Sequence, residues 1–233
     1  MALSPAQRKS VYLTIPAYNE GAVIRETLQP VLDAGYSAVV VDDGSRDDTW
    51  QQLAGLRLHC LRHPFNLGQG AALQTAVSYA LLQGAEYIVH FDADGQHDPQ
   101  GIDDLLAPLL AGGADVVLGS RFLRREDWLA VPRGRRVLLK MAVVVNGLLT
   151  GLWLSDAHNG ARAFTRAAAS QIMLRENGFA HATEILQQIR RQGLRYVERP
   201  TRIRYTDYSQ FKGQKASNAV NILIDLLIRR FIR

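Results

Sequence analysis

The sequence contains a single cysteine, Cys60, among its 233 residues. One thiol excludes an internal disulfide framework and favours a reducing compartment, so we expect a cytoplasmic protein. Cys60 lies in a short apolar segment, residues 58–61, which indicates a packing role rather than a nucleophile. Residues 1–10 also lack the apolar run of a signal peptide.

Long apolar segments are scarce as well. The longest extends from Val137 to Leu154, is interrupted by Lys140 and Asn146, and barely reaches the length of a bilayer span. A buried helix or a helix lying on a membrane surface is therefore favoured over a span. Trp128 and Trp153 flank the segment and support the surface position, which would make the protein peripheral on the cytoplasmic face of the inner membrane.

The charge of the chain is unevenly distributed. Lys and Arg number 27 against 22 acidic residues, and the excess lies mainly between residues 190 and 233. A basic end indicates an anionic partner, such as a phosphate-bearing substrate, a membrane surface or nucleic acid. Residues 217–232 are predicted to form an amphipathic helix whose arginine-rich end either faces water or docks on anionic lipids. Few aromatic residues are interleaved with the basic ones, so no nucleic-acid partner is expected.

Short apolar runs alternate with helical patterns through the first half of the chain. Strands are predicted at 11–15, 38–41, 58–61, 87–91 and 115–118, and helices at 21–32, from about Arg46, at 70–83 and at 100–110. Later strands are expected at 162–164 and 195–204, with helices at 166–174 and 182–192. This pattern predicts one α/β domain, residues 1–233, with a mostly parallel, Rossmann-like sheet covered by helices on both faces.

The segment Asp92-Ala93-Asp94-Gly95-Gln96 directly follows a predicted strand. Extended residues two apart face the same side, so Asp92 and Asp94 are expected to converge at the end of that strand. Carboxylates suit a hard cation such as Mg²⁺ or Mn²⁺, which proteins commonly share with substrate phosphates. Gly95 permits a tight turn that would bring Gln96 round as another ligand. The residues alone leave a second interpretation open, an acidic turn that caps the next helix.

Three other polar motifs also follow predicted strands, where open α/β sheets bind ligands. The motifs 16–20 and 42–45 are either strand-to-helix turns or a pocket for a base and a ribose. The glycines of the motif 66–70 resemble those of a phosphate loop, although they match neither the dinucleotide fingerprint nor the Walker pattern.

Taken together and in this order, the motifs resemble family-two glycosyltransferases of GT-A fold. The resemblance is closest to the dolichol- or polyprenol-phosphate mannosyltransferase branch and extends over about residues 11–200. It rests on Pro16–Glu20, Val41–Ser45 with Asp47 and Thr49, Asn66–Gly70, Asp92–Pro99, Gly119–Arg121, Asp156 through Gly160 to Arg162, Glu184, and Glu198–Pro200.

The resemblance implies a division of labour along the chain. Residues 11–121 would bind a nucleotide sugar, 122–204 the acceptor, and 205–233 would form a basic, amphipathic end. The implied nucleoside and phosphate residues are Pro16, Tyr18, Glu20, Asp43, the adjacent Asp42, and Gly70. The implied metal ligands are Asp92, Asp94 and Gln96, and the implied anion-binding residues are Arg121, Arg162, Arg199, Lys212 and Lys215.

The implied reaction is inverting transfer of a sugar from a UDP- or GDP-sugar to a polyprenyl phosphate, assisted by Mg²⁺ or Mn²⁺. A lipid phosphate needs cationic neighbours but no base, whereas a hydroxyl of a glycan or small molecule would need a carboxylate base, for which Asp156 and Glu184 are the candidates. The segment 205–215 spaces its basic residues differently from that branch, so both acceptors stay open. A nucleotidyltransferase is a further alternative, but the segment 16–20 after the first strand is not the glycine-rich basic loop typical of that class.

Overall fold

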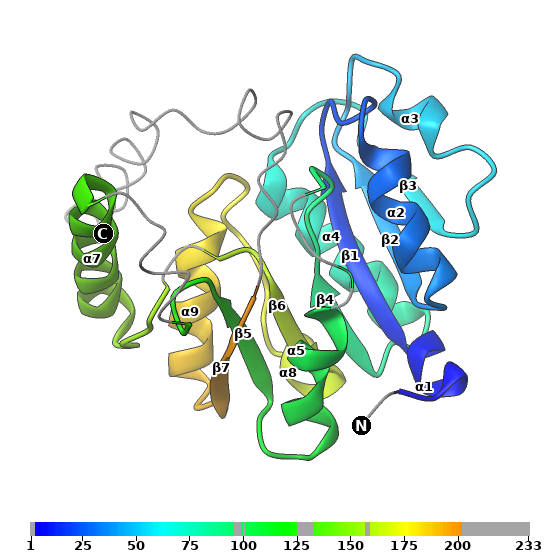
Figure 1. Ribbon diagram of the computed structural model, residues 1–233. Coiled ribbons are helices and arrows are strands. Elements are labelled where there is room, and N and C mark those ends of the chain that lie inside the picture. The colour runs from blue at the N-terminus through cyan, green and yellow to red at the C-terminus, as the bar shows by residue number, and fades with distance from the viewer. Residues whose placement is uncertain (1–2, 96–98, 100, 125–132, 157–158, 202–233) are drawn as a thin grey trace.

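The computed structural model describes residues 3–95, 99, 101–124, 133–156 and 159–201 and contains one seven-stranded sheet in the order β3-β2-β1-β4-β6-β5-β7 (Figure 1). The strands are β1 (Val11–Ala17), β2 (Ser37–Asp42), β3 (His59–Arg62), β4 (Tyr87–His90), β5 (Val116–Ser120), β6 (Arg162–Thr165) and β7 (Tyr196–Pro200). The helices are α1 (Pro5–Lys9), α2 (Ile24–Asp33), α3 (Thr49–Gln52), α4 (Gln69–Leu82), α5 (Gly101–Leu110), α7 (Arg133–Thr150), α8 (Arg166–Ala169) and α9 (His181–Arg191).

The sheet is mostly parallel, which confirms the predicted α/β class. Strands β1, β2, β3 and β4 pair in parallel, as do β5 and β7. Strand β6 runs antiparallel between β4 and β5. The sequence pattern did not predict this reversal, because short apolar strands carry no mark of their direction.

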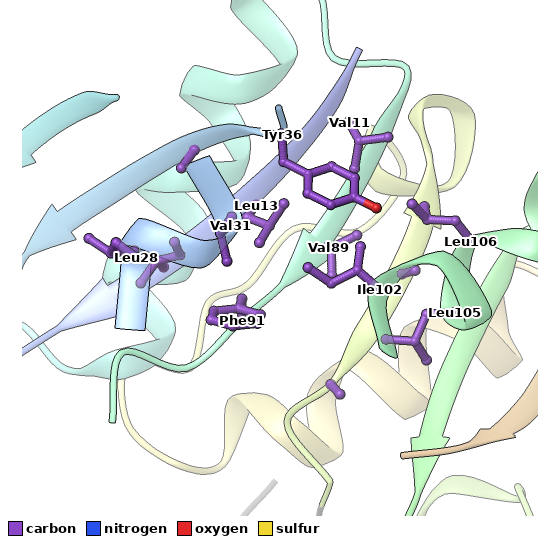
Figure 2. Packing of buried hydrophobic residues seen from close by; sticks show 14 of the residues in the cluster. Val11, Leu13, Leu28, Val31, Tyr36, Val89, Phe91, Ile102, Leu105 and Leu106 are labelled. Atoms are coloured by element: carbon purple, nitrogen blue, oxygen red, sulfur yellow. The ribbon is translucent and has the colours of Figure 1, made fainter. Parts of the chain in front are cut away.

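Helices cover both faces of the sheet, and residue alternation assigns each side chain to one face. One core cluster lies between the sheet and helices α2 and α5, where Val89 and Phe91 pack with Ile102 and Leu106 (Figure 2). The other lies beneath α4, α8 and α9 and contains the alternate β4 residue Ile88. Each fully buried aliphatic side chain contributes roughly 1.5–3 kcal/mol to folding.

Several predicted elements differ from the structure in their bounds; α2 begins at Ile24 rather than at Gly21. The helix expected from about Arg46 begins only at Thr49, because Ser45 binds another loop instead of capping a helix, and Asp47 bridges that loop to the Thr49 amide. The Ser45 hydroxyl accepts from the Asn19 amide at 2.9 Å, and the Asp47 carboxylate accepts from the Gly21 amide at 3.0 Å. The helix predicted at 166–174 is shorter and ends at Ala169.

Helix α7 contains most of the long apolar segment and ends at Thr150, followed by Gly151 with φ of +73°. It lies at the side of the domain, next to α9 (Figure 1). Among the helices that the structure describes, none is long and apolar enough to cross a membrane. The amphipathic helix predicted at 217–232 and the end of the strand predicted at 195–204 lie outside the described residues.

Candidate functional site

The loops that follow β1 and β2 are joined by hydrogen bonds at the carboxyl edge of the sheet. Parallel pairing sets Ala17 beside Asp42, and the Asp43 amide donates to the Ala17 carbonyl at 2.8 Å. The Glu20 amide donates to the Thr49 hydroxyl at 2.8 Å, and the Arg46 amide to the Asn19 side chain at 2.8 Å. The implied nucleoside residues Pro16, Tyr18, Glu20, Asp42 and Asp43 are therefore brought together by these two loops.

The buried Asp43 carboxylate organises the loop after β3. It accepts hydrogen bonds from the Leu67 and Gly68 amides at 2.9 and 2.8 Å and contacts His63 Nδ1 at 2.7 Å. His63 Nε2 in turn lies 3.0 Å from the Thr75 hydroxyl on α4. Both Asp43 carboxylate oxygens therefore bind groups of the chain itself. Asp43 holds the loop after β3 in place, a structural role that the sequence motif did not indicate.

Asp42 points to the other side of the sheet and is covered by Arg62. One carboxylate oxygen accepts from the Ser45 amide at 2.9 Å. The other, Oδ2, lies 3.0 Å from Arg62 Nε as an ion pair but is not aligned for a hydrogen bond. The Arg62 guanidinium also stacks on the Trp50 ring. Sequence reasoning missed Arg62 and Trp50, because no motif marks either of them.

Gly70 lies at the start of α4, where it meets the segment before α9. Its amide donates to the Asn177 carbonyl at 2.7 Å, and a Cβ at this position would overlap the Glu176 carbonyl oxygen. Glu184 holds the same segment, since its carboxylate accepts from the Arg175 and Glu176 amides at 3.0–3.1 Å. The structure therefore engages both Gly70 and Glu184 in contacts within the chain.

Asp92 and Asp94 lie in the turn after β4, and Gly95 there has φ of +76°, as the tight turn requires. The Asp92 carboxylate rests against Gly160, where a Cβ would lie 2.7 Å from Oδ2, so Gly160 makes room for it. In the described ranges, no group of three or more His, Cys, Asp or Glu side chains could hold a metal ion. Two carboxylates suit a divalent cation that takes its other ligands from substrate phosphates and water. Gln96 lies outside the described residues.

Arg162 is 3% exposed and opposes His90 across the β4–β6 pair. Burial lowers the pKa of its guanidinium to about 10, and the carboxylates of Asp92 and Asp156 partly offset that shift. No hydrogen bond joins the guanidinium to a residue in the described ranges. No Arg162 nitrogen is among the fully buried side-chain atoms that lack a partner, so its N–H donors reach the surface of the site, where an anionic ligand could accept from them.

Asp156 pairs with Arg121 in a two-pronged ion pair. Arg121 Nε and Nη2 lie 2.7 and 2.8 Å from the two Asp156 oxygens, and the Arg121 amide also donates to Oδ2 at 3.1 Å. The neighbouring Ser155 is held by Glu198, which accepts from its amide at 2.9 Å and from its hydroxyl at 2.7 Å. Because Asp156 interacts electrostatically with both arginines, Arg121 and Arg162 belong to one group.

Arg199, another implied anion-binding residue, does not join this group in the structure. Arg199 is exposed on the edge strand β7. It lies on the same sheet face as Val197, the face covered by α2 and α5, whereas Arg162 lies on the opposite face. Lys212 and Lys215 lie outside the described residues.

Two buried histidines border the group, and no sequence motif revealed them. Burial, together with the charge of Arg162, lowers the pKa of His90 well below its usual value and that of His181 to about 4. His90 packs against the Phe164 ring, and its Nδ1 has no hydrogen-bond partner in the described part of the chain. His181 approaches from the first turn of α9. The floor of the site thus combines a charged guanidinium with two neutral imidazoles.

Comparison with known proteins identifies related chains. The sequence model described as "Glycosyl transferase family 2" matches residues 12–173. The UDP-N-acetylglucosamine–dolichyl-phosphate N-acetylglucosaminyltransferase of Methanococcus voltae is 29% identical, over 94% of this chain and 96% of its own length. The polyprenol monophosphomannose synthase of Mycolicibacterium smegmatis is 31% identical, over 84% of this chain and 77% of its own.

A solved structure shares the fold. The glucosyl-3-phosphoglycerate synthase of Mycobacterium tuberculosis, solved with Mn²⁺, UDP-glucose and phosphoglyceric acid, superimposes with a TM-score of 0.65 at 19% identity. The match covers 99% of this chain and 84% of that protein. The likeness confirms the predicted GT-A fold.

Proposed function

The chain belongs to glycosyl transferase family 2, and we propose that it moves a sugar from a UDP- or GDP-sugar to a polyprenyl phosphate, with inversion at the anomeric carbon. It is a glycosyltransferase, and two relatives named for transfer to dolichyl phosphate or for polyprenol monophosphomannose synthesis support the lipid acceptor. The observation that carries the proposal is Arg162, a buried guanidinium beside Asp92 whose hydrogen-bonding capacity is left for an anionic ligand.

On the donor side, Tyr18 and Glu20 are partly exposed above the joined loops and would receive the nucleoside, while Asp43 keeps the loop after β3 in place. Asp92 and Asp94 would hold a divalent cation, which supplies Lewis-acid stabilisation to the departing diphosphate. Arg162 would donate hydrogen bonds to the same phosphates, because its guanidinium interacts electrostatically with the Asp92 carboxylate.

On the acceptor side, the carboxylates that could serve as bases already have other partners. Asp156 holds Arg121 in place, and Glu184 binds two backbone amides. A phosphate oxygen near neutral pH attacks without losing a proton and needs a cation to position it, a role that Arg121 would fill. This arrangement favours a phosphate acceptor over a hydroxyl acceptor.

Helix α7 would bring the enzyme to the membrane surface that carries such a lipid. Met141, Val144 and Leu148 follow one face of α7 and are 57%, 47% and 65% exposed; we call these three side chains the α7 apolar face. Lys140 lies exposed beside it, and Trp153 follows the helix with 63% of its surface exposed. An apolar helix face bordered by a cation is typical of segments that lie in a lipid interface.

The decisive experiment incubates the full chain and Mn²⁺ or Mg²⁺ with a panel of UDP- and GDP-sugars and either undecaprenyl or dolichyl phosphate. We expect release of one nucleoside diphosphate together with a glycosylated lipid phosphate of inverted configuration. Asp94→Ala should weaken both Mn²⁺ and donor binding, whereas Asp33→Ala, on the exposed end of α2, should not. Transfer only to a glycan or small-molecule hydroxyl would refute the lipid acceptor, and unchanged binding in Asp94→Ala would refute the metal assignment.

A further inference from the structure

His181 is buried where the start of α9 meets the start of α4. His181 is only 5% exposed. A Cβ added at Gly70 would lie 2.9 Å from the His181 Cβ, so the two helix starts are in close contact. His181 Nδ1 lies 2.8 Å from the Gly178 carbonyl oxygen. A carbonyl only accepts, so Nδ1 carries the hydrogen of this bond.

The other ring nitrogen is therefore a lone-pair acceptor. The imidazole is neutral at neutral pH, because burial and the neighbouring Arg162 lower its pKa to about 4. With the hydrogen on Nδ1, Nε2 can only accept a hydrogen bond. It has no hydrogen-bond partner within the described part of the chain.

The neighbours of His181 place this acceptor at the floor of the donor site. Gly70, where a Cβ would lie 2.9 Å from the His181 Cβ, directly follows Gln69, whose Nε2 lies 3.5 Å from Asp92 Oδ1. The charges of Arg162 and Asp92 also act on the His181 ring. The oxygens of a diphosphate cannot donate to Nε2, and two acceptors facing each other repel. A group that reaches Nε2 must therefore bring its own hydrogen, and on a nucleotide sugar bound over Asp92 and Arg162 the hydroxyls of the sugar are such groups.

We propose that His181 is a specificity-determining residue that accepts a hydrogen bond from one hydroxyl of the transferred sugar. The inference rests on the proposed function and assigns a role to a residue that no motif marks. A site that hydrogen-bonds a substrate hydroxyl discriminates against sugars that lack it or present it in the other orientation, since Nε2 then loses its donor.

The test replaces the imidazole with a ring that keeps its packing. His181→Phe should lower kcat/KM for the donor that the wild type prefers by about tenfold, the effect of one lost hydrogen bond to a neutral group. Monodeoxy analogues of that sugar, lacking the 2-, 3-, 4- or 6-hydroxyl where the sugar has it, identify the contact. With the analogue that lacks the hydroxyl bound by His181, wild type and His181→Phe should have the same kcat/KM, because neither can form that hydrogen bond. His181→Gln, which returns an acceptor oxygen, should recover part of the preference.

Two controls separate this role from a structural one. Affinity for the free nucleoside diphosphate, measured by calorimetry, should be the same in wild type and His181→Phe. His59→Phe, which changes a β3 histidine that stacks on Tyr12 and meets the Tyr79 ring at a tilt, should leave the sugar preference unchanged. An equal loss with every donor and every analogue, or a loss of diphosphate affinity, would overturn the inference. A wild type that transfers sugar but shares its preferences with His181→Phe overturns the inference alone, whereas a wild type inactive with every nucleotide sugar overturns the proposed function as well.

Discussion

The β1–β2–β3 side of the site and the β4–β6–β5 side satisfy their buried polar groups in different ways. On the first side, the Asp43 carboxylate receives two backbone amides and a histidine, and the loops after β1 and β2 exchange several hydrogen bonds. On the second side, Arg162 and the Nε2 atom of His181 make no hydrogen bond within the described ranges, and His90 Nδ1 is fully buried without a partner there.

The difference separates what the chain builds for itself from what it leaves for a ligand. A buried polar group without a partner costs about 1–3 kcal/mol, so the second side lowers the stability of the ligand-free protein. Under the proposed function, Arg162 and His181 Nε2 would gain hydrogen bonds when an anion and a sugar bind. The first side is organised by the chain itself, and the proposal predicts that substrate completes the second.

Arg162→Met should produce the largest loss of kcat/KM among these variants. A small loss would contradict the contrast between the two sides of the site. Removing the unsatisfied cation should lower kcat/KM by about a hundredfold, as loss of one preorganised donor to a developing charge does. The thermal midpoint should stay the same or rise, because a costly buried charge is removed. Arg166→Met, at the start of α8 directly after β6, is the control and should retain activity. Full activity in Arg162→Met would mean that Arg162 binds no substrate anion.

Asp43→Asn tests the β1–β2–β3 side, where Asp43 is held by hydrogen bonds within the chain. The amide group of asparagine cannot accept from Leu67, Gly68 and His63 together, so we expect a loss of about 2 kcal/mol in the free energy of unfolding. Urea denaturation followed by circular dichroism measures this loss. Asp33→Asn, which changes an exposed carboxylate paired with Gln29, should cost far less. Equal stabilities for the two variants would contradict the scaffold role of Asp43.

Asp156→Asn distinguishes a positioning role from a base. If Asp156 only orients Arg121, the variant should lose about tenfold in kcat/KM, because asparagine keeps the shape but only one acceptor oxygen. The dependence of kcat on pH should keep its form. A base works only when deprotonated, so a base assignment predicts instead that the fall in kcat toward low pH disappears in the variant. That outcome would show that Asp156 acts as the general base rather than as a positioning residue for Arg121.

The smallest effect is expected at the α7 apolar face. The double variant Met141→Ser/Val144→Ser should bind anionic vesicles severalfold more weakly. Burying each native side chain in lipid contributes roughly 1 kcal/mol to the binding free energy. Vesicle flotation measures the bound fraction. Leu82→Ser is the matched control, because Leu82 is 83% exposed on α4, outside this face. Equal losses in both variants would show that α7 has no special affinity for lipid.

Much of the fold follows from local patterns in the sequence. The apolar runs that became β1, β2 and β4, and the helical patterns of α4 and α9, need only short stretches of chain to specify them. The position of Asp92 and Asp94 directly after a strand was also readable, because alternation and the glycine turn are local properties.

The local patterns could not reveal which polar groups would find partners. Asp43 meets amides about 24 residues away, and Asp156 meets Arg121 across 35 residues. The direction of β6, the encounter of Gly70 with Asn177 and the burial of His181 likewise depend on segments far apart in the chain. The sequence by itself determined the elements and the residue types at the sheet edge. Only the tertiary structure decided which of those residues hold the fold and which are left to bind, because hydrogen-bond partners and burial are set by long-range packing.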